Sequence, residues 1–141
     1  MLKNNVLRKI GTISRIVASK SDIKFKKYNL QKGQHIFLVR VCEHPGSNLM
    51  ELTQMLNVDK STTTKAIQKL EKAGYIIKIH PKNNQKVLLL FPTEQAIDVY
   101  EHIIDEENIR AELCFKGFTK KEQQQAIHYL ERMCQNIEAY K

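Results

Sequence analysis

The stretch DKSTTTKAIQKLEKAG, which runs from Asp59 to Gly74, reads as one short helix around which the rest of the chain can be interpreted. Asp59 is a good N-cap, because its carboxylate can accept hydrogen bonds from the free N–H groups of the first turn. Gly74 follows the last turn, where a left-handed residue commonly ends a helix. The spacing of the apolar residues predicts a buried seam that consists of Thr63, Ala66, Ile67 and Leu70.

The side of this helix opposite the seam carries hydroxyl groups, an amide and cations. At about 100° per residue, Ser61, Lys65, Gln68 and Lys72 lie on that side. Such a face suits contact with a nucleic acid, and it also suits a helix surface that only faces water. The helix taken alone therefore leaves both interpretations open.

The residues before this helix predict a second, shorter helix. Asn48 followed by Glu51 has the form of a capping box, with Asn in the place of Ser or Thr. Asn57 lies where a left-handed residue would turn the chain toward Asp59. A short helix, a tight turn and a second helix with exposed hydroxyls and lysines form the helix-turn-helix pattern. The inner face of the short helix is supplied by Leu49, Leu52, Met55 and Leu56.

After Gly74 the sequence predicts a β-hairpin. The apolar runs Tyr75–Ile79 and Val87–Phe91 read as two antiparallel strands joined by a polar turn, KNNQK. A hairpin that follows a helix-turn-helix is a wing, and the tip of this wing is basic and contains no acidic residue. Pro92 closes the hairpin, and Thr93 can cap a helix that begins at Glu94.

Three further helices are expected outside the helix-turn-helix and its wing. Apolar residues three or four positions apart, from Val6 to Val17, predict a long first helix that ends near residues 24–28. The apolar segment Gln34–Glu43 fits a buried helix or a buried strand, and we interpret it as a helix. Thr119 and Glu122 form a second capping-box pair, which opens the last helix. The apolar stripes of these flanking helices exceed what a small winged domain needs, so we expect a dimer interface between the chain ends.

Composition indicates a single domain with a polyanionic partner. The chain has 141 residues, 42% of them hydrophobic, and a net charge of +8. Residues 1–32 hold nine basic residues against one acidic residue, and residues 54–92 hold seven Lys against two acidic residues. Uneven charge of this kind suits phosphate binding. Three cysteines without a CxxC spacing favour a reduced, cytoplasmic protein, and the longest apolar run is too short to span a membrane.

From Leu30 to Ala96, the order of these signals resembles the MarR family of winged helix-turn-helix transcription regulators. The most specific part is VDKST, from Val58, followed by Leu70, Glu71 and Gly74. Further matching residues are Leu30, Gln34, Pro45, Gly46, Glu51, Leu52, Thr93 and Glu94. The chain departs from the family pattern in its wing, where Asn83 to Lys86 replace the usual Asp and Arg residues. It also departs at Thr63, where an aliphatic residue is usual, and at Ala96, where Gly is common.

The resemblance implies a mainly α fold with a small β-wing, in one domain over residues 1–141. The winged helix-turn-helix would cover residues 31–93, and residues 1–30 and 94–141 would supply dimerisation helices. A homodimer would place two recognition helices in successive major grooves of a pseudo-palindromic site on double-stranded DNA, and it would act as a repressor. A winged helix that binds protein or RNA without operator DNA is the alternative.

The resemblance also indicates which residues of this chain would contact DNA or a small effector. The DNA-binding candidates are Lys60, Ser61, Thr62, Thr64, Lys65, Gln68 and Lys69 in the helix, with Lys82 and Lys86 in the wing. Many MarR-like dimers lose DNA affinity when a small, often aromatic molecule enters a pocket between the dimer helices and the winged domain. The candidate lining residues for such an effector are Ile13, Val17, Phe37, Val41 and Tyr100.

The sequence also bears on three other functions: an oxidant sensor, a metal site and an enzyme active site. Some relatives use a cysteine as an oxidant sensor, but we favour a buried structural thiol for Cys42, because no basic group is clearly placed to lower its pKa. Asp98, His102 and Glu106 could bridge a metal with His80 or His128, but a solvated helix face fits them better, so we expect neither a metal nor a cofactor. The sequence contains no nucleophile elbow, Gly-rich phosphate loop or zinc-hydrolase motif, and we therefore do not expect an enzyme.

Overall fold

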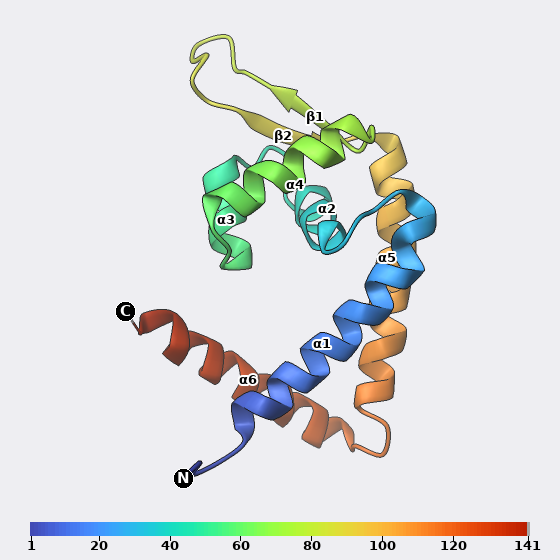
Figure 1. The fold of residues 1–141 in the computed structure, drawn as a ribbon, viewed down its shortest axis with the longest axis vertical. Helices are drawn as coiled ribbons and strands as arrows, with labels where there is room; N and C mark the ends of the chain where they lie inside the picture. The colour runs from blue at the N-terminus through green and yellow to red at the C-terminus, as the bar shows by residue number, and fades with distance from the viewer. Residues whose placement is uncertain (141) are drawn as a thin grey trace. The chain divides into compact units, whose positions relative to one another are not determined.

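A computed structural model describes residues 1–140 and confirms a mainly helical fold with a small β-wing (Figure 1). The chain divides into two compact units, Met1–Asp105 and the segment that begins at Glu106. The elements in chain order are α1 Val6–Lys24, η1 (a 3-10 helix) Phe25–Tyr28, α2 Gln34–Glu43, α3 Leu49–Leu56, α4 Lys60–Lys72, β1 Ile76–Ile79, β2 Leu89–Pro92, α5 Glu94–Cys114 and α6 Lys120–Ala139.

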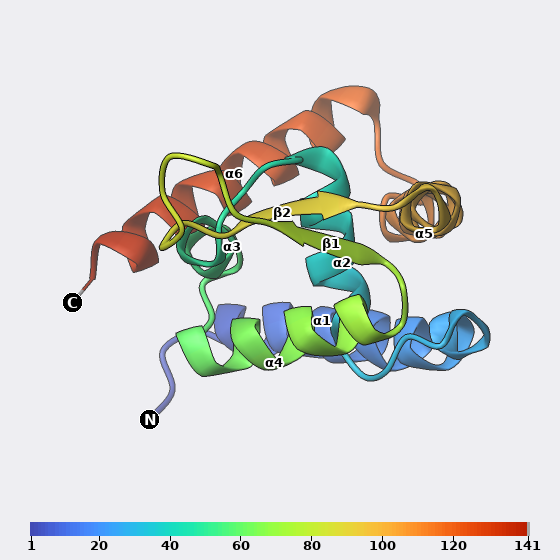
Figure 2. The same ribbon diagram turned by 90° about the horizontal axis from the view of Figure 1, so that it is seen from above.

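The core of the first unit lies where α2, α3, α4 and the hairpin meet. α2 packs against α3, α4 and β2, and Figure 2 shows the hairpin crossing in front of α2. The segment Gln34–Glu43 is therefore a helix, as expected. Its burial on most sides explains why periodicity alone could not separate a helix from a strand. The apolar core side chains with the least exposure are Leu38, Val41, Leu52, Ile67, Leu70, Leu90 and Ala96.

The ends of α3 are fixed by the side chains that the sequence indicates. Asn48 Oδ1 accepts a hydrogen bond from the Glu51 N–H at 2.8 Å, and Glu51 Oε1 accepts one from the Asn48 N–H at 3.2 Å. Asn57 adopts a left-handed conformation, with φ of 51°, and ends the helix. The predicted capping box and turn are confirmed, so the direction of α4 is set within a few residues of its start.

The hairpin pairs β1 with β2 in an antiparallel register that runs from Ile76 opposite Pro92 to Ile79 opposite Leu89. β2 begins at Leu89, two residues later than the apolar run from Val87 predicts. The reason is that the turn uses the backbone of Val87: its N–H donates to Asn84 O at 3.3 Å, and its carbonyl bonds the His80 ring at 2.9 Å. A residue held by its own loop cannot also extend the ladder.

The N-terminal helix is joined to the end of α4 through a tyrosine. Tyr75, which follows α4 and is buried, donates its hydroxyl hydrogen bond to the backbone carbonyl of Tyr28 in η1. Burial raises the pKa of the Tyr75 hydroxyl, so this donor stays protonated at neutral pH. η1 is therefore held beside the helix-turn-helix within the first unit.

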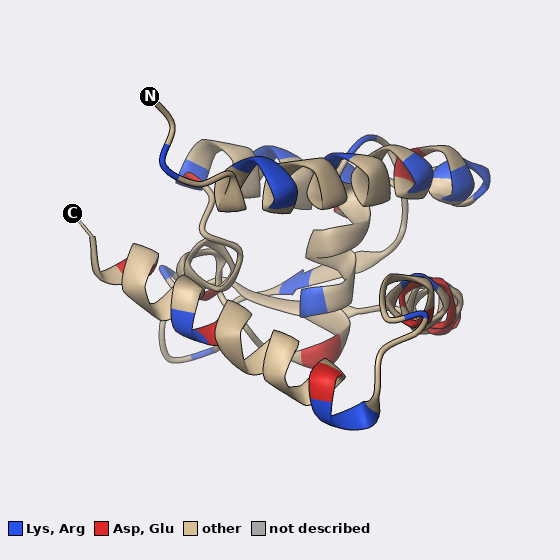
Figure 3. Ribbon diagram, turned by 90° about the horizontal axis from the view of Figure 1, so that it is seen from below, with Lys and Arg blue, Asp and Glu red and all other residues tan. Residues whose placement is uncertain are grey.

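The helices at the two chain ends leave most of their apolar residues exposed. α1 has one buried residue, Ser21, among its nineteen described positions, and basic residues recur along its length (Figure 3). α6 begins at the predicted capping box of Thr119 and Glu122, and none of its described residues, 120–139, is buried. No helix within residues 1–140 is long and apolar enough to cross a membrane.

Candidate nucleic-acid interface

α4 turns its predicted seam inward. Thr63 and Leu70 are fully buried, Ile67 is 1% exposed and Ala66 is 8% exposed. No other residue of α4 is buried, and the whole helix lies in the described part of the chain. The opposite side of the helix therefore faces solvent, with its cations and hydrogen-bonding groups outward.

The start of α4 is held by Asp59. Its carboxylate accepts a hydrogen bond from the Thr62 N–H at 2.7 Å. The hydrogen bond from the Thr62 backbone, followed by that from the Thr62 side chain, lowers the pKa of the Asp59 carboxyl. The cap is therefore ionised at neutral pH, and its contribution to stability is lost only as pH falls through this lowered value. A fixed first turn places the next residues of α4 in a defined orientation.

The seven candidate residues of α4 differ in how their side chains are engaged. The Thr64 hydroxyl donates to the Lys60 carbonyl at 2.9 Å, and Thr62 bonds Asp59. Lys65 and Gln68 lie one turn further along the same exposed side. The hydroxyl groups of Thr62 and Thr64 therefore already have partners at the start of the helix, whereas the Lys65 amine and the Gln68 amide can extend from the helix surface. The exposed residues among the candidates are Lys60, Ser61, Thr62, Lys65, Gln68 and Lys69.

The wing presents two of its three lysines at the tip. Lys82 and Lys86 are exposed, and the Lys86 N–H donates to Asn84 Oδ1 at 3.0 Å, which shapes the turn. Lys78, on β1, instead forms an ion pair with Glu71 of α4 at 3.3 Å. Lys78 is therefore engaged between the hairpin and the helix, and the tip lysines remain the candidates for phosphate contact.

The effector candidates occupy different environments within the first unit. Phe37 and Val41 lie one turn apart on α2 and belong to the buried core. Ile13 is exposed on α1, and Val17 is half-buried one turn later. Tyr100 is half-buried on α5 and packs against the core. Whether these residues line a ligand pocket stays a prediction.

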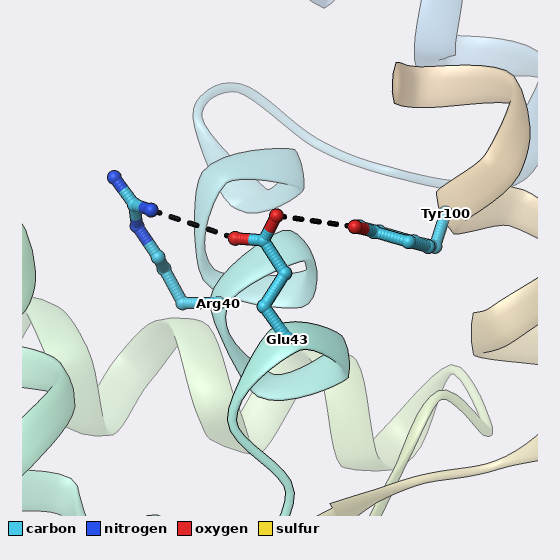
Figure 4. Close-up of polar contacts among 3 residues, drawn as sticks. All are labelled: Arg40, Glu43 and Tyr100. Atoms are coloured by element: carbon cyan, nitrogen blue, oxygen red, sulfur yellow. Dashed lines mark hydrogen bonds and ion pairs between the residues drawn. The ribbon is translucent and has the colours of Figure 1, made fainter. Parts of the chain in front are cut away.

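The structure adds a polar link that sequence reasoning missed. The Tyr100 hydroxyl donates to Glu43 Oε2 at 3.1 Å, and Glu43 Oε1 accepts from Arg40 Nη1 at 3.5 Å (Figure 4). Glu43 is the last residue of α2, so this contact joins the end of α2 to α5. Tyr100 and Glu43 lie 57 positions apart, so no local sequence pattern indicates that they pair.

Cys42 lies in an environment that suppresses thiol chemistry. It is half-buried, and burial, followed by the charge of Glu43, raises its pKa to about 11. The thiolate is the reactive form of cysteine, so this thiol is a poor nucleophile at neutral pH. The environment supports the structural interpretation of Cys42 over the sensor.

We therefore expect the three thiols to react at different rates. Cys114 and Cys134 are exposed, and both should be alkylated by iodoacetamide at pH 7.5 well before Cys42. Mass spectrometry of a time course would measure the order, and guanidinium-unfolded protein provides the control in which all three react alike. Early modification of Cys42 in the native protein would contradict this assignment.

Two of the residues on α5 that were considered as metal ligands make other contacts. The His102 ring stacks on the Tyr28 ring, with centroids 5.8 Å apart, and Glu106 pairs with Arg110 at 3.5 Å. Within residues 1–140, no group of three or more His, Cys, Asp or Glu side chains is placed to hold a metal ion.

Comparisons with known proteins agree with this architecture. A family model described as MarR family matches residues 30–88. The uncharacterized HTH-type transcriptional regulator YybA of Bacillus subtilis (strain 168) is 40% identical over 135 residues, which cover 96% of this chain and 90% of that protein.

Two solved structures resemble the chain over nearly its whole length. A MarR protein from Peptoclostridium difficile has a TM-score of 0.93 at 53% identity, over 98% of this chain and 90% of the other. A MarR family transcriptional regulator from Listeria monocytogenes, complexed with 26mer DNA, has a TM-score of 0.91 at 43% identity, over 97% and 90% of the two chains. The chain thus belongs to the MarR family, whose members are transcription regulators and not enzymes.

Proposed function

We propose that this protein binds double-stranded DNA as a homodimer and represses transcription from a pseudo-palindromic operator. The observation that carries the proposal is α4, which is capped at Asp59, buried along its seam and exposed along the face that holds Lys65 and Gln68. The Listeria regulator, 43% identical to this chain, was solved in complex with 26mer DNA. That likeness supports DNA as the partner of the same helix here.

The side chains on α4 have the chemistry to read and position DNA. The Gln68 amide can bond an adenine edge at two positions, and Lys65 can donate to a guanine. The hydroxyl groups and the remaining lysines suit phosphate oxygens, which fix the register of a protein on the duplex without reading its sequence. In this proposal Lys82 and Lys86 of the wing contact the DNA backbone beside the bases that α4 reads.

Dimerisation is supported by the apolar surface at the chain ends. Ile127, Leu130, Met133 and Ile137 recur at three- and four-residue steps on α6, and each is at least 40% exposed. α1 exposes a comparable series, with Leu7, Ile10, Ile13 and Ile16. Apolar stripes of this size are unfavourable in water and typically mark an interface. We propose that residues 1–30 and 94–141 dimerise, while residues 31–93 form the winged helix-turn-helix.

Selection of bound fragments from genomic DNA tests the proposal directly. We expect enriched sequences to contain two inverted half-sites whose centres lie about one helical turn, roughly 34 Å, apart. An RNA duplex of the recovered sequence serves as the control and should bind more weakly. Lack of enrichment, or preference for the RNA, would reject operator binding. In the cytoplasm of cells that express the protein, an operator inserted between a promoter and a reporter gene should lower transcription of that gene.

We propose further that a small aromatic molecule releases the dimer from DNA. The candidate residues offer apolar surface that an aromatic ring would contact: Ile13 is exposed and Val17 half-buried on α1, and the half-buried Tyr100 packs against the core that contains Phe37 and Val41. Phenol and benzoate are suitable probes. Release of the recovered operator that is weakened by Val17→Trp would support the site, and unchanged operator affinity at millimolar probe would reject it.

A further inference from the structure

The two helices of the helix-turn-helix are joined by a pair of threonine hydroxyls. Thr53 Oγ1 on α3 and Thr63 Oγ1 on α4 lie 2.8 Å apart, within hydrogen-bond distance. Thr63 is fully buried and Thr53 is half-buried. Both residues also lie one turn after a backbone carbonyl on their own helix: Thr53 Oγ1 is 2.8 Å from Leu49 O, and Thr63 Oγ1 is 3.3 Å from Asp59 O.

The hydrogen bond between the helices persists in either arrangement of the protons. Each hydroxyl has one proton and two lone pairs. If Thr53 donates to Leu49 O, then Thr63 donates to Thr53. If Thr63 donates to Asp59 O, then Thr53 donates to Thr63. The shorter of the two carbonyl distances, that to Leu49, favours the first arrangement.

The bond between Thr53 and Thr63 restrains the rotation of α4 against α3, which apolar packing alone does not fix. Contacts between apolar side chains are non-directional, so Leu52 and Ile67 can keep their burial through a small rotation of one helix against the other. A hydrogen bond weakens steeply when its angle or distance departs from the optimum. Thr63 lies between Thr62 and Thr64, two of the residues proposed to contact DNA. A rotation of α4 about its axis would therefore move every proposed contact together.

We propose that Thr53 and Thr63 are positioning residues for DNA recognition, which set the rotation of α4 against α3. The inference rests on the proposed operator binding and adds that specificity depends on a buried side-chain bond that touches no DNA. Each hydroxyl keeps a carbonyl on its own helix when the other is removed, so removal has little effect on stability. Discrimination between DNA sequences is the quantity that changes, because base contacts depend on geometry more strictly than phosphate contacts do.

The test compares Thr53→Val, Thr63→Val and the double variant with the wild type. Affinities are measured at one salt concentration for the selected operator and for a duplex of scrambled sequence, together with melting temperatures. We expect each variant to bind the operator about tenfold more weakly, a loss on the scale of one base contact, with unchanged affinity for the scrambled duplex. The double variant should resemble the single variants, because all three lack the same bond.

Two further variants separate positioning from general stability. Thr63→Ser keeps the hydroxyl and should restore discrimination. Ser47→Ala removes a comparable hydroxyl bond to a backbone carbonyl, from Ser47 to His44 O at 2.6 Å, at a residue proposed neither to contact DNA nor to dimerise, and should leave the discrimination between the two duplexes unchanged. Full discrimination by Thr63→Val, or equal losses on both duplexes that follow the melting temperature, would overturn the inference. A wild type that does not distinguish the two duplexes would instead reject operator binding itself, and the positioning role with it.

Discussion

Replacing Lys65 by alanine is expected to weaken operator binding by about 10- to 100-fold, the range of one specific base contact. Lys65 is exposed on the side of α4 opposite the buried seam, close to the capped first turn. If its amine also neutralises a phosphate, the slope of log affinity against log salt should fall by about one. A binding series over several salt concentrations measures both quantities.

The control for this substitution is Lys120→Ala. Lys120 is also exposed and begins α6, outside the proposed DNA interface and before the apolar stripe that starts at Ile127, so its loss removes the same charge from the protein. We expect Lys120→Ala to leave the operator affinity and the salt slope close to those of the wild type. If Lys65→Ala behaves like Lys120→Ala throughout the series, Lys65 does not contact DNA.

The local structure around α4 could be predicted because its signals are short-range. The Asp59 cap, the left-handed Asn57 and the buried seam each depend on residues within one or two helical turns. The capping boxes that begin α3 and α6 are of the same kind. This explains why the bounds of these helices follow from the sequence, together with the side of α4 that faces solvent.

Contacts between distant residues could not be predicted in the same way. The sequence identified Thr63 as an inner-face residue in an unusual place, but it did not indicate Thr53 as its partner, because that pairing depends on how α3 crosses α4. The sequence also did not indicate the contact from Tyr100 to Glu43 or the ion pair from Lys78 to Glu71, because both depend on how distant elements pack. Periodicity shows which side of a helix is buried, but it does not show which side chain lies opposite.

The wing illustrates both kinds of signal. Its strands and basic tip follow from the two apolar runs, the polar KNNQK turn between them and the boundary at Pro92. The start of β2 at Leu89 could not be predicted in this way, because the hydrogen bonds of Val87 to Asn84 and His80 are made inside the loop. The exposed Lys82 and Lys86 suit contact with phosphates, whereas reading of the minor groove of the kind that arginine provides has no counterpart among the residues of the tip.

Replacing Leu130 by glutamate is expected to separate the proposed dimer. Leu130 lies in the apolar stripe of α6 and is 45% exposed in the single chain, so the substitution should not disturb the fold of a protomer. In a dimer the carboxylate would be buried against apolar side chains without a partner, at an expected cost of several kcal/mol. Sedimentation equilibrium should then give a mass near 16.4 kDa for the variant, whereas we expect twice that value for the wild type.

Loss of the dimer should also lower operator affinity, because two linked half-site contacts become two independent events. Gln135→Glu is the matched control: it adds the same charge to an exposed position on the other side of α6, and both the mass and the operator affinity should stay at the wild-type values. A Leu130→Glu protein that remains dimeric would place the interface elsewhere. One that is monomeric but binds a two-half-site operator as tightly as the wild type would remove dimerisation from the recognition mechanism.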